Sequence, residues 1–155
     1  MERIPSFSID HTRLSRGVYL SREDDDVRTW DLRMKEPNHG DYLANGVLHT
    51  IEHLFATFAR NGQYRQGIVY FGPMGCRTGC YLLTRGLSDA QVLDCIRACF
   101  REMVDFEGEI PGAKEEECGN YREHDLPGCR AESAAYLSVL EELTPEDMRY
   151  RYTLA

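Results

Sequence analysis

Two histidines four positions apart, with a glutamate directly before the second, are the first feature of this sequence that could carry chemistry. Residues 49–53 read His-Thr-Ile-Glu-His, which has the form H-x-x-E-H. Imidazoles at this spacing project from one side of a helix and can share a metal ion, while Glu52 can transfer a proton without being a ligand. The pattern predicts a metal centre with an acid/base group beside it. The alternative is a pair of partly buried histidines on an amphipathic helix.

A metal ion held by His49 and His53 needs a further ligand, which could be a histidine, a cysteine or a carboxylate. Cys118 is a lone cysteine within the polar stretch 116–121, where a thiol has little reason to pack into a core. A set of two histidines and one cysteine would leave a fourth coordination position open. Such an open position is typical of catalytic sites, whereas structural zinc is usually closed by four protein ligands.

The chain has six cysteines, and Cys76 differs from the others in its surroundings. It lies in a loop bounded by glycines, beside Arg77, where a cation and exposed backbone N–H groups would favour a thiolate. The start of the chain has no apolar run after a basic segment, so we expect a cytosolic protein with free thiols rather than disulfides. The remaining cysteines are expected to be structural: Cys80, Cys95, Cys99 and Cys129.

Length and charge limit the classes of function. The chain has 155 residues, and 18 Lys and Arg against 26 Asp and Glu give a net charge of −8. This length predicts a single domain, residues 1–155, with a real hydrophobic core. The acidic balance opposes binding to nucleic acid. No stretch approaches the roughly 18 consecutive apolar residues that span a membrane, so neither nucleic acid nor membrane is an expected partner.

The expected strands and helices lack the regular strand–helix alternation of a parallel fold. An apolar stripe predicts a helix over 43–60, and His49 and His53 lie roughly 160° from that stripe, away from the core. In the second expected strand, Arg33 points to the face opposite Trp30. We therefore predict an α+β fold, an antiparallel-rich sheet packed with helices. The other expected elements are strands over 17–23, 27–34, 67–71 and 79–87, a helix from a Ser88–Gln91 capping box to near Gly108, and a helix over 130–143.

Five segments together resemble the S-ribosylhomocysteine lyase (LuxS) family, and they span most of the chain in the family's order. The pentapeptide at 49–53 alone is a weak signal, but the whole set at these separations is highly specific. The segments are SFSIDH (6–11), DLRMKEPN (31–38), HTIEH (49–53), GPMGCRTG (72–79) and IPGAKEEECGNYREHDL (110–126).

The resemblance implies a cytosolic homodimer of α+β fold with its active site at the dimer interface. It implies one divalent metal ion per subunit, iron(II) natively and often zinc or cobalt in preparations. The implied reaction cleaves the thioether of S-ribosylhomocysteine to homocysteine and 4,5-dihydroxy-2,3-pentanedione, the precursor of autoinducer-2. It proceeds by successive carbonyl migration through enediolates and a final β-elimination, and the cellular role is quorum-sensing signalling or recycling within the methionine cycle.

The resemblance also assigns roles to individual residues. The implied metal ligands are His49, His53 and Cys118, the implied acid/base groups are Glu52 and Cys76, and the residues implied to hold the substrate are Ser6, His11 and Arg33. One departure is visible, because Tyr70-Phe71-Gly72 stands where the family often has Asp-Ile-Ser. Position 70 therefore offers no carboxylate, although the metal set is unaffected.

Two other classes of function are compatible with parts of the pattern. H-x-x-E-H also occurs in inverzincin peptidases, and a small zinc peptidase would use Glu52 to activate water without needing Cys76. A non-catalytic zinc module would need four closed protein ligands and would lose its fold on chelation.

Overall fold

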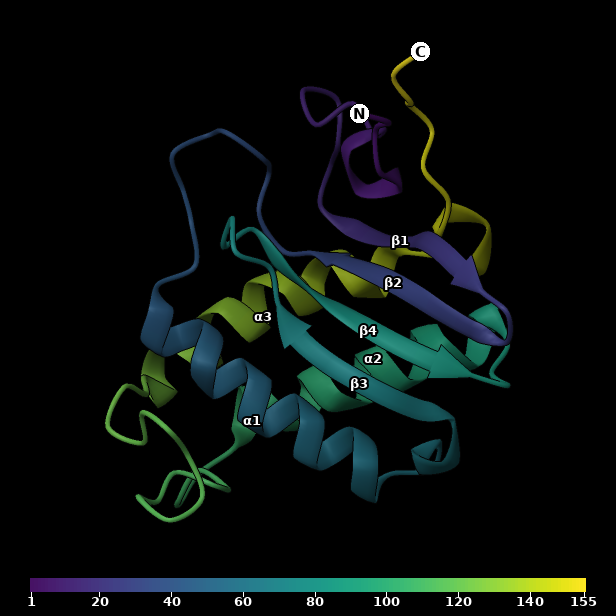
Figure 1. Cartoon of the computed structure of the whole chain (residues 1–155). Coiled ribbons are helices and arrows are strands. Elements are labelled where there is room, and N and C mark those ends of the chain that lie inside the picture. The colour runs from purple at the N-terminus through teal and green to yellow at the C-terminus, as the bar shows by residue number, and fades with distance from the viewer.

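The computed structural model describes residues 1–155 and contains a four-stranded sheet with three helices (Figure 1). The strands are β1 (Gly17–Asp24), β2 (Val27–Arg33), β3 (Ile68–Pro73) and β4 (Gly79–Arg85). They pair in the order β1-β2-β4-β3, and every pairing is antiparallel. The predicted α+β fold with an antiparallel sheet is confirmed.

The two hairpins of the sheet have different connections. Asp24 pairs with Val27, so only two residues join β1 to β2, and the first of them, Asp25, has a φ of 53°. A turn this tight needs left-handed backbone, which Asp tolerates better than most residues. The connection from β3 to β4 is longer, and it is closed by the Met74 N–H donating to the Gly79 carbonyl at 2.9 Å. This second turn carries Cys76.

The helices are α1 (Asn45–Asn61), α2 (Asp89–Asp105) and α3 (Leu126–Glu142), and short 3₁₀ turns cover Pro5–Phe7, Arg65–Gly67 and Pro145–Asp147. Figure 1 shows α2 and α3 behind the sheet and α1 beside β3. The predicted capping box is present, because the Ser88 side chain accepts from Gln91 N–H and the Gln91 side chain accepts from Ser88 N–H. None of the helices combines the length and hydropathy needed to cross a bilayer.

The third helix begins at Leu126, four residues earlier than the predicted start at Arg130. In the structure, the Asp125 side chain accepts the Gly128 N–H at 2.9 Å as an N-cap. Proline is tolerated in the first turn of a helix because its missing N–H would have no partner there. The helix therefore starts at the end of the loop that carries Cys118.

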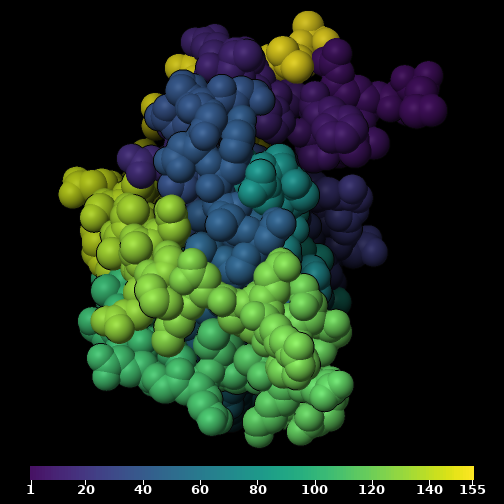
Figure 2. Space-filling model, turned by 90° about the vertical axis from the view of Figure 1, so that its left-hand side faces the viewer, coloured from purple at the N-terminus to yellow at the C-terminus, as the bar shows by residue number.

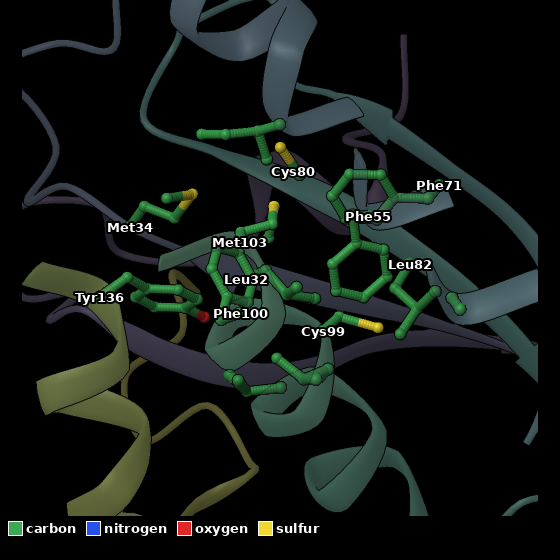
Figure 3. Close-up of a cluster of buried hydrophobic side chains, with 14 of the residues drawn as sticks. Leu32, Met34, Phe55, Phe71, Cys80, Leu82, Cys99, Phe100, Met103 and Tyr136 are labelled. Carbon is green, nitrogen blue, oxygen red and sulfur yellow. The ribbon is translucent and has the colours of Figure 1, made fainter. Parts of the chain in front are cut away.

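The core lies between the sheet and the helices, as Figure 3 shows. Phe55 of α1 stacks on Phe71 of β3 with 4.0 Å between ring centroids, and Trp30 and Leu32 face the same core. Asp31 and Arg33 alternate with them and bond to each other, as a strand's two-residue period requires. The apolar stripe of α1 thus fixes the helix against the sheet and leaves its other side for His49 and His53.

Candidate metal centre and reactive thiol

Four side chains converge beside α1. Candidate ligand atoms of His49, His53, Cys118 and His124 all lie within 4.8 Å of one another. The Cys118 Sγ lies 3.3 Å from His49 Nε2, although the two residues are 69 positions apart in the chain. Nitrogen and sulfur ligands on one tetrahedral metal ion are separated by roughly this distance. The structure therefore brings together the three residues that the sequence analysis proposed as ligands.

Backbone carbonyls orient the two helical histidines. His49 Nδ1 lies 2.8 Å from the Glu123 carbonyl oxygen, and His53 Nδ1 lies 2.7 Å from that of Pro111. A carbonyl oxygen can only accept, so each Nδ1 carries the proton and each Nε2 keeps a free lone pair. Metal-binding histidines are usually held in this way. The donor set fits a divalent metal ion.

The loop between α2 and α3 supplies these carbonyls and Cys118. Its end is fastened to α1, because the Asp125 N–H donates both to the Gly46 carbonyl at 3.2 Å and to the Thr50 hydroxyl at 2.9 Å. At its start, Gly112 has a φ of +73°, and a Cβ there would lie 3.1 Å from His53 Nδ1. Glycine therefore lets the backbone pass close to the imidazole.

His124 is the member of the group that sequence reasoning did not select. Its ring stacks on His49 with 4.0 Å between centroids, and its Nδ1 lies 3.0 Å from the Thr50 hydroxyl. Burial, followed by the proximity of His49 and His53, lowers the pKa of His124 to about 4. A histidine six residues after Cys118 in the same polar segment was the available signal.

Glu52 lies between the two histidines in sequence but outside the group of candidate ligands. Its half-buried side chain lines a hollow of about 300 Å³ together with His49, Met74 and Gly75. It also lines a neighbouring hollow of about 360 Å³ with His53 and Tyr70. Glu52 is therefore positioned to meet a molecule that approaches the metal group.

Cys76 lies at the tip of the β3–β4 turn and is exposed, as predicted, while Cys80, Cys95, Cys99 and Cys129 are buried. The cation that contacts it is Arg33, whose Nη1 lies 4.0 Å from Sγ. Arg77, the neighbouring cation named in the sequence analysis, makes no hydrogen bond to Cys76. The Arg77 guanidinium donates instead to the Leu43 carbonyl at 3.3 Å.

Arg33 is more deeply placed than its expected role in holding the substrate suggested. Its exposed fraction is only 3%, and it donates to Asp31 Oδ2 and to the Thr78 hydroxyl, each at 2.7 Å. Asp31 also accepts from the Tyr150 hydroxyl at 2.5 Å. The Thr78 hydroxyl in turn lies 3.1 Å from Cys76 Sγ. The Cys76 thiol therefore contacts Arg33 and Thr78, which belong to a buried hydrogen-bond network that includes the Asp31 carboxylate.

One pocket of about 500 Å³ gathers the remaining predicted residues, since Ser6, His11, Arg33 and Cys76 all line it. Ser6 comes from the 3₁₀ turn Pro5–Phe7, and the His11 ring is oriented by the Ile9 carbonyl, 2.8 Å from Nδ1. These residues are far apart in the sequence, so their convergence depends on tertiary structure.

The metal group and the thiol pocket lie on either side of one short segment. Pro73, Met74 and Gly75 line both the hollow beside Glu52 and the pocket of Cys76. Figure 2 shows this face, with the teal turn between the purple N-terminal residues and the green loop that carries Cys118. Within a single chain, the metal side and the thiol side therefore open into separate hollows.

The departure at Tyr70-Phe71-Gly72 has a structural counterpart. Tyr70 is 53% exposed and lines the hollow that contains Glu52 and His53. Its hydroxyl lies directly over Gly72, so a Cβ at that position would overlap it. The Tyr70 side chain therefore occupies space that is free only because residue 72 has no side chain.

The fold and the site define a class of small α+β proteins with a candidate metal group, in which two histidines on a helix and a cysteine on a loop lie beside a carboxylate, and an exposed thiol lines a neighbouring pocket. Comparison with known proteins identifies the class more closely. Residues 4–146 match the family described as S-Ribosylhomocysteinase (LuxS). The chain belongs to this family.

Three relatives illustrate the similarity. The S-ribosylhomocysteine lyase of Phocaeicola vulgatus is 52% identical over 157 residues, covering 97% of this chain and 98% of that protein. The S-ribosylhomocysteine lyases of Borreliella afzelii and Clostridium acetobutylicum are 46% and 40% identical, each over 156 residues, covering 97% of this chain and 99% of each relative. The similarity therefore extends over nearly the full length on both sides.

Proposed function

We propose that this chain is an S-ribosylhomocysteine lyase, which cleaves the thioether of S-ribosylhomocysteine to homocysteine and 4,5-dihydroxy-2,3-pentanedione. Membership of the family supports the assignment. The observation that carries it in the structure is the convergence of His49, His53 and Cys118 with free ligand atoms next to an acidic side chain. In the family, 4,5-dihydroxy-2,3-pentanedione is the precursor of autoinducer-2.

His49, His53 and Cys118 would hold a divalent metal ion, with iron(II), cobalt and zinc all compatible with this donor set. When bound, the ion would supply Lewis-acid polarisation of the sugar oxygens. We propose iron(II) as the metal in the cell. The carbonyls of Glu123 and Pro111 keep the imidazoles in the tautomer that ligation requires.

Glu52 and Cys76 are the proposed acid/base groups. A thioether is a poor leaving group from an ordinary sugar carbon, but it can be eliminated once a carbonyl lies two carbons away. Moving that carbonyl along the sugar through enediols requires repeated removal and return of protons on both faces of the sugar's carbon chain. A carboxylate at one side and a thiolate at the other can each act in turn as base and acid.

Ser6 and His11 are proposed to bind the hydroxyl and amino acid parts of the substrate, since both line the pocket of Cys76. Arg33 lines the same pocket, but its bonds to Asp31 and Thr78 leave little of it free. We therefore propose that Arg33 contacts the substrate only at the floor of the pocket, beside the Cys76 sulfur.

We further propose that the enzyme is a homodimer with each active site at the interface. Within one chain the residues Pro73, Met74 and Gly75 separate the metal side from the thiol side, and a second copy could bring the two together. Large apolar side chains that are exposed in the single chain line these openings: Phe7 (65%) and Tyr42 (40%) line the Cys76 pocket, and Tyr70 (53%) lines the hollow that contains Glu52 and His53. Exposed apolar surface of this kind is typical of an interface.

Free thiol released from S-ribosylhomocysteine, measured together with metal content on the same sample, tests the proposal. We expect thiol release in proportion to bound metal. A metal-containing protein that releases no thiol and instead hydrolyses peptides would support the peptidase alternative. A protein that unfolds when the metal is chelated and has neither activity would support the structural zinc module.

A further inference from the structure

The hydroxyl of Thr50, a fully buried residue of α1, determines which nitrogen of His124 carries a proton. A hydroxyl group has one hydrogen to donate and two lone pairs that accept. The Thr50 hydroxyl donates to the Gly46 carbonyl at 2.9 Å and accepts the Asp125 N–H at 2.9 Å. Its remaining lone pair faces His124 Nδ1 at 3.0 Å, so that nitrogen must be the donor. His124 therefore carries its free lone pair on Nε2.

This free nitrogen is buried and has no hydrogen-bond partner in the protein. An unpartnered buried acceptor is unfavourable, and native proteins contain few of them. Because Nδ1 is engaged by Thr50, Nε2 is the atom with which His124 joins the group of candidate ligands around His49, His53 and Cys118. The missing partner of Nε2 therefore belongs to the metal centre.

The stacking of His124 on His49 shows that the two cannot bind one ion together. Their rings are 4.0 Å apart between centroids and inclined by only 19°. A nitrogen lone pair lies in the plane of its own ring, and a single ion cannot lie in the planes of two stacked, nearly parallel rings. His53, in contrast, is inclined by 88° to His49, so those two lone pairs can meet at one ion. His124 is also inclined by 75° to His53, but it is His49 Nε2 that lies 3.3 Å from Cys118 Sγ. With His49 as the ligand of this stacked pair, the partner of His124 Nε2 is not the ion itself.

We infer that His124 accepts a hydrogen bond from the hydroxyl group that occupies the coordination position left open by His49, His53 and Cys118. An acceptor requires a donor, and the donors that can also occupy this coordination position through oxygen carry an O–H group: water in the absence of substrate and a sugar hydroxyl during turnover. The sugar hydroxyl rests on the proposed function, whereas the water does not. His124 would thereby orient the substrate at the metal.

Cobalt(II)-loaded protein tests the inference without relying on activity. In His124→Phe the stacked ring is retained and the acceptor is lost, and His39→Phe is a matched control outside the metal group. We expect one cobalt ion per chain and an unchanged number of imidazole ligands by X-ray absorption in both variants. The visible cobalt bands should shift in His124→Phe only, because the fourth ligand loses its acceptor. Its kcat/KM for thiol release should fall roughly 10- to 100-fold.

Thr50 provides a second variant that leaves His124 in place. Thr50→Val keeps the shape but removes the acceptor of the Nδ1 proton, so it should shift the cobalt bands in the same direction as His124→Phe. Thr50→Ser keeps the hydroxyl and should resemble the wild type.

Two results would overturn the inference. Loss of cobalt or of one imidazole ligand in His124→Phe would make His124 a ligand, and unchanged bands and kcat/KM would leave it without a role at the metal. If the wild type releases no thiol, the proposed function fails, but the cobalt spectra still decide the role of His124.

Discussion

The metal group and the Cys76 pocket lie on one face of the chain, but different kinds of structure hold them in place. Helical spacing presents His49 and His53, and carbonyls of an irregular loop set their tautomers. Cys76 is exposed on a strand turn, and a buried network from β2 supports it through Arg33. The metal side depends on backbone geometry, whereas the thiol side depends on charge. Mutations on the two sides should therefore fail in different ways.

The largest effect is expected from loss of a metal ligand. His53→Ala should lose the metal ion and reduce thiol release by roughly 10⁴-fold or more, since the ion contributes several kcal/mol to the stabilisation of developing charge. Elemental analysis and thiol release, measured on one sample, check both parts. His39→Ala serves as the control, and a His53→Ala protein with full metal content would contradict the assignment.

Glu52→Gln tests whether the metal side also contains a base that is independent of the ion. The variant should keep its metal and lose about 10²- to 10⁴-fold in turnover, as is typical of a general base. Metal content and kcat are the measurements. If the variant loses its metal but keeps its activity per bound ion, Glu52 is a ligand or orients one.

Cys76→Ser tests the thiol side in the same way. It should fold and bind metal normally but lose roughly 10²- to 10⁴-fold in turnover, because a serine hydroxyl is a far weaker acid than a thiol. In the wild type, Cys76 should react with iodoacetamide faster than the buried Cys95 and Cys99. Peptide mapping after limited alkylation measures this. Equal labelling, together with near-normal turnover of Cys76→Ser, would remove Cys76 from the mechanism.

A smaller effect, on stability, is expected from a change in the buried network of Arg33, Asp31 and Tyr150 next to Cys76. Tyr150→Phe removes a hydrogen bond to the buried Asp31, whose Oδ1 already has no partner. Unfolding free energy should fall by about 1.5–3 kcal/mol, as for other bonds to buried charged groups, while the metal content stays constant. Urea denaturation of wild type and variant checks this. An unchanged unfolding free energy would show that the network does not depend on Tyr150.

The metal side was largely predictable because its information is local. The period of the apolar residues in α1 predicts which side faces the core, and the two histidines then lie on the other side. Cys118 could be selected as a thiol without a packing role, and the family resemblance agreed. His124 was not predictable in this way, since its position depends on a bond to Thr50, 74 residues away.

The thiol side was predictable only in part. The exposure of Cys76 follows from its glycine-bounded turn, but the identity of the neighbouring cation does not. Arg33 reaches Cys76 across 43 residues, and its partner Asp31 is bound by Tyr150 from the end of the chain, 119 residues away. Contacts at such separations depend on how the sheet and the C-terminal segment pack, which local patterns do not determine.

Thiol release by a mixture of two inactive chains tests most directly whether the metal side and the thiol side work together across an interface. His53→Ala lacks the metal side and Cys76→Ser lacks the thiol side. If each active site combines the metal side of one copy with the thiol side of the other, a mixed dimer regains one intact site, and a statistically mixed sample should recover about a quarter of wild-type thiol release. A mixture that exchanges subunits yet stays as inactive as its components would contradict this account.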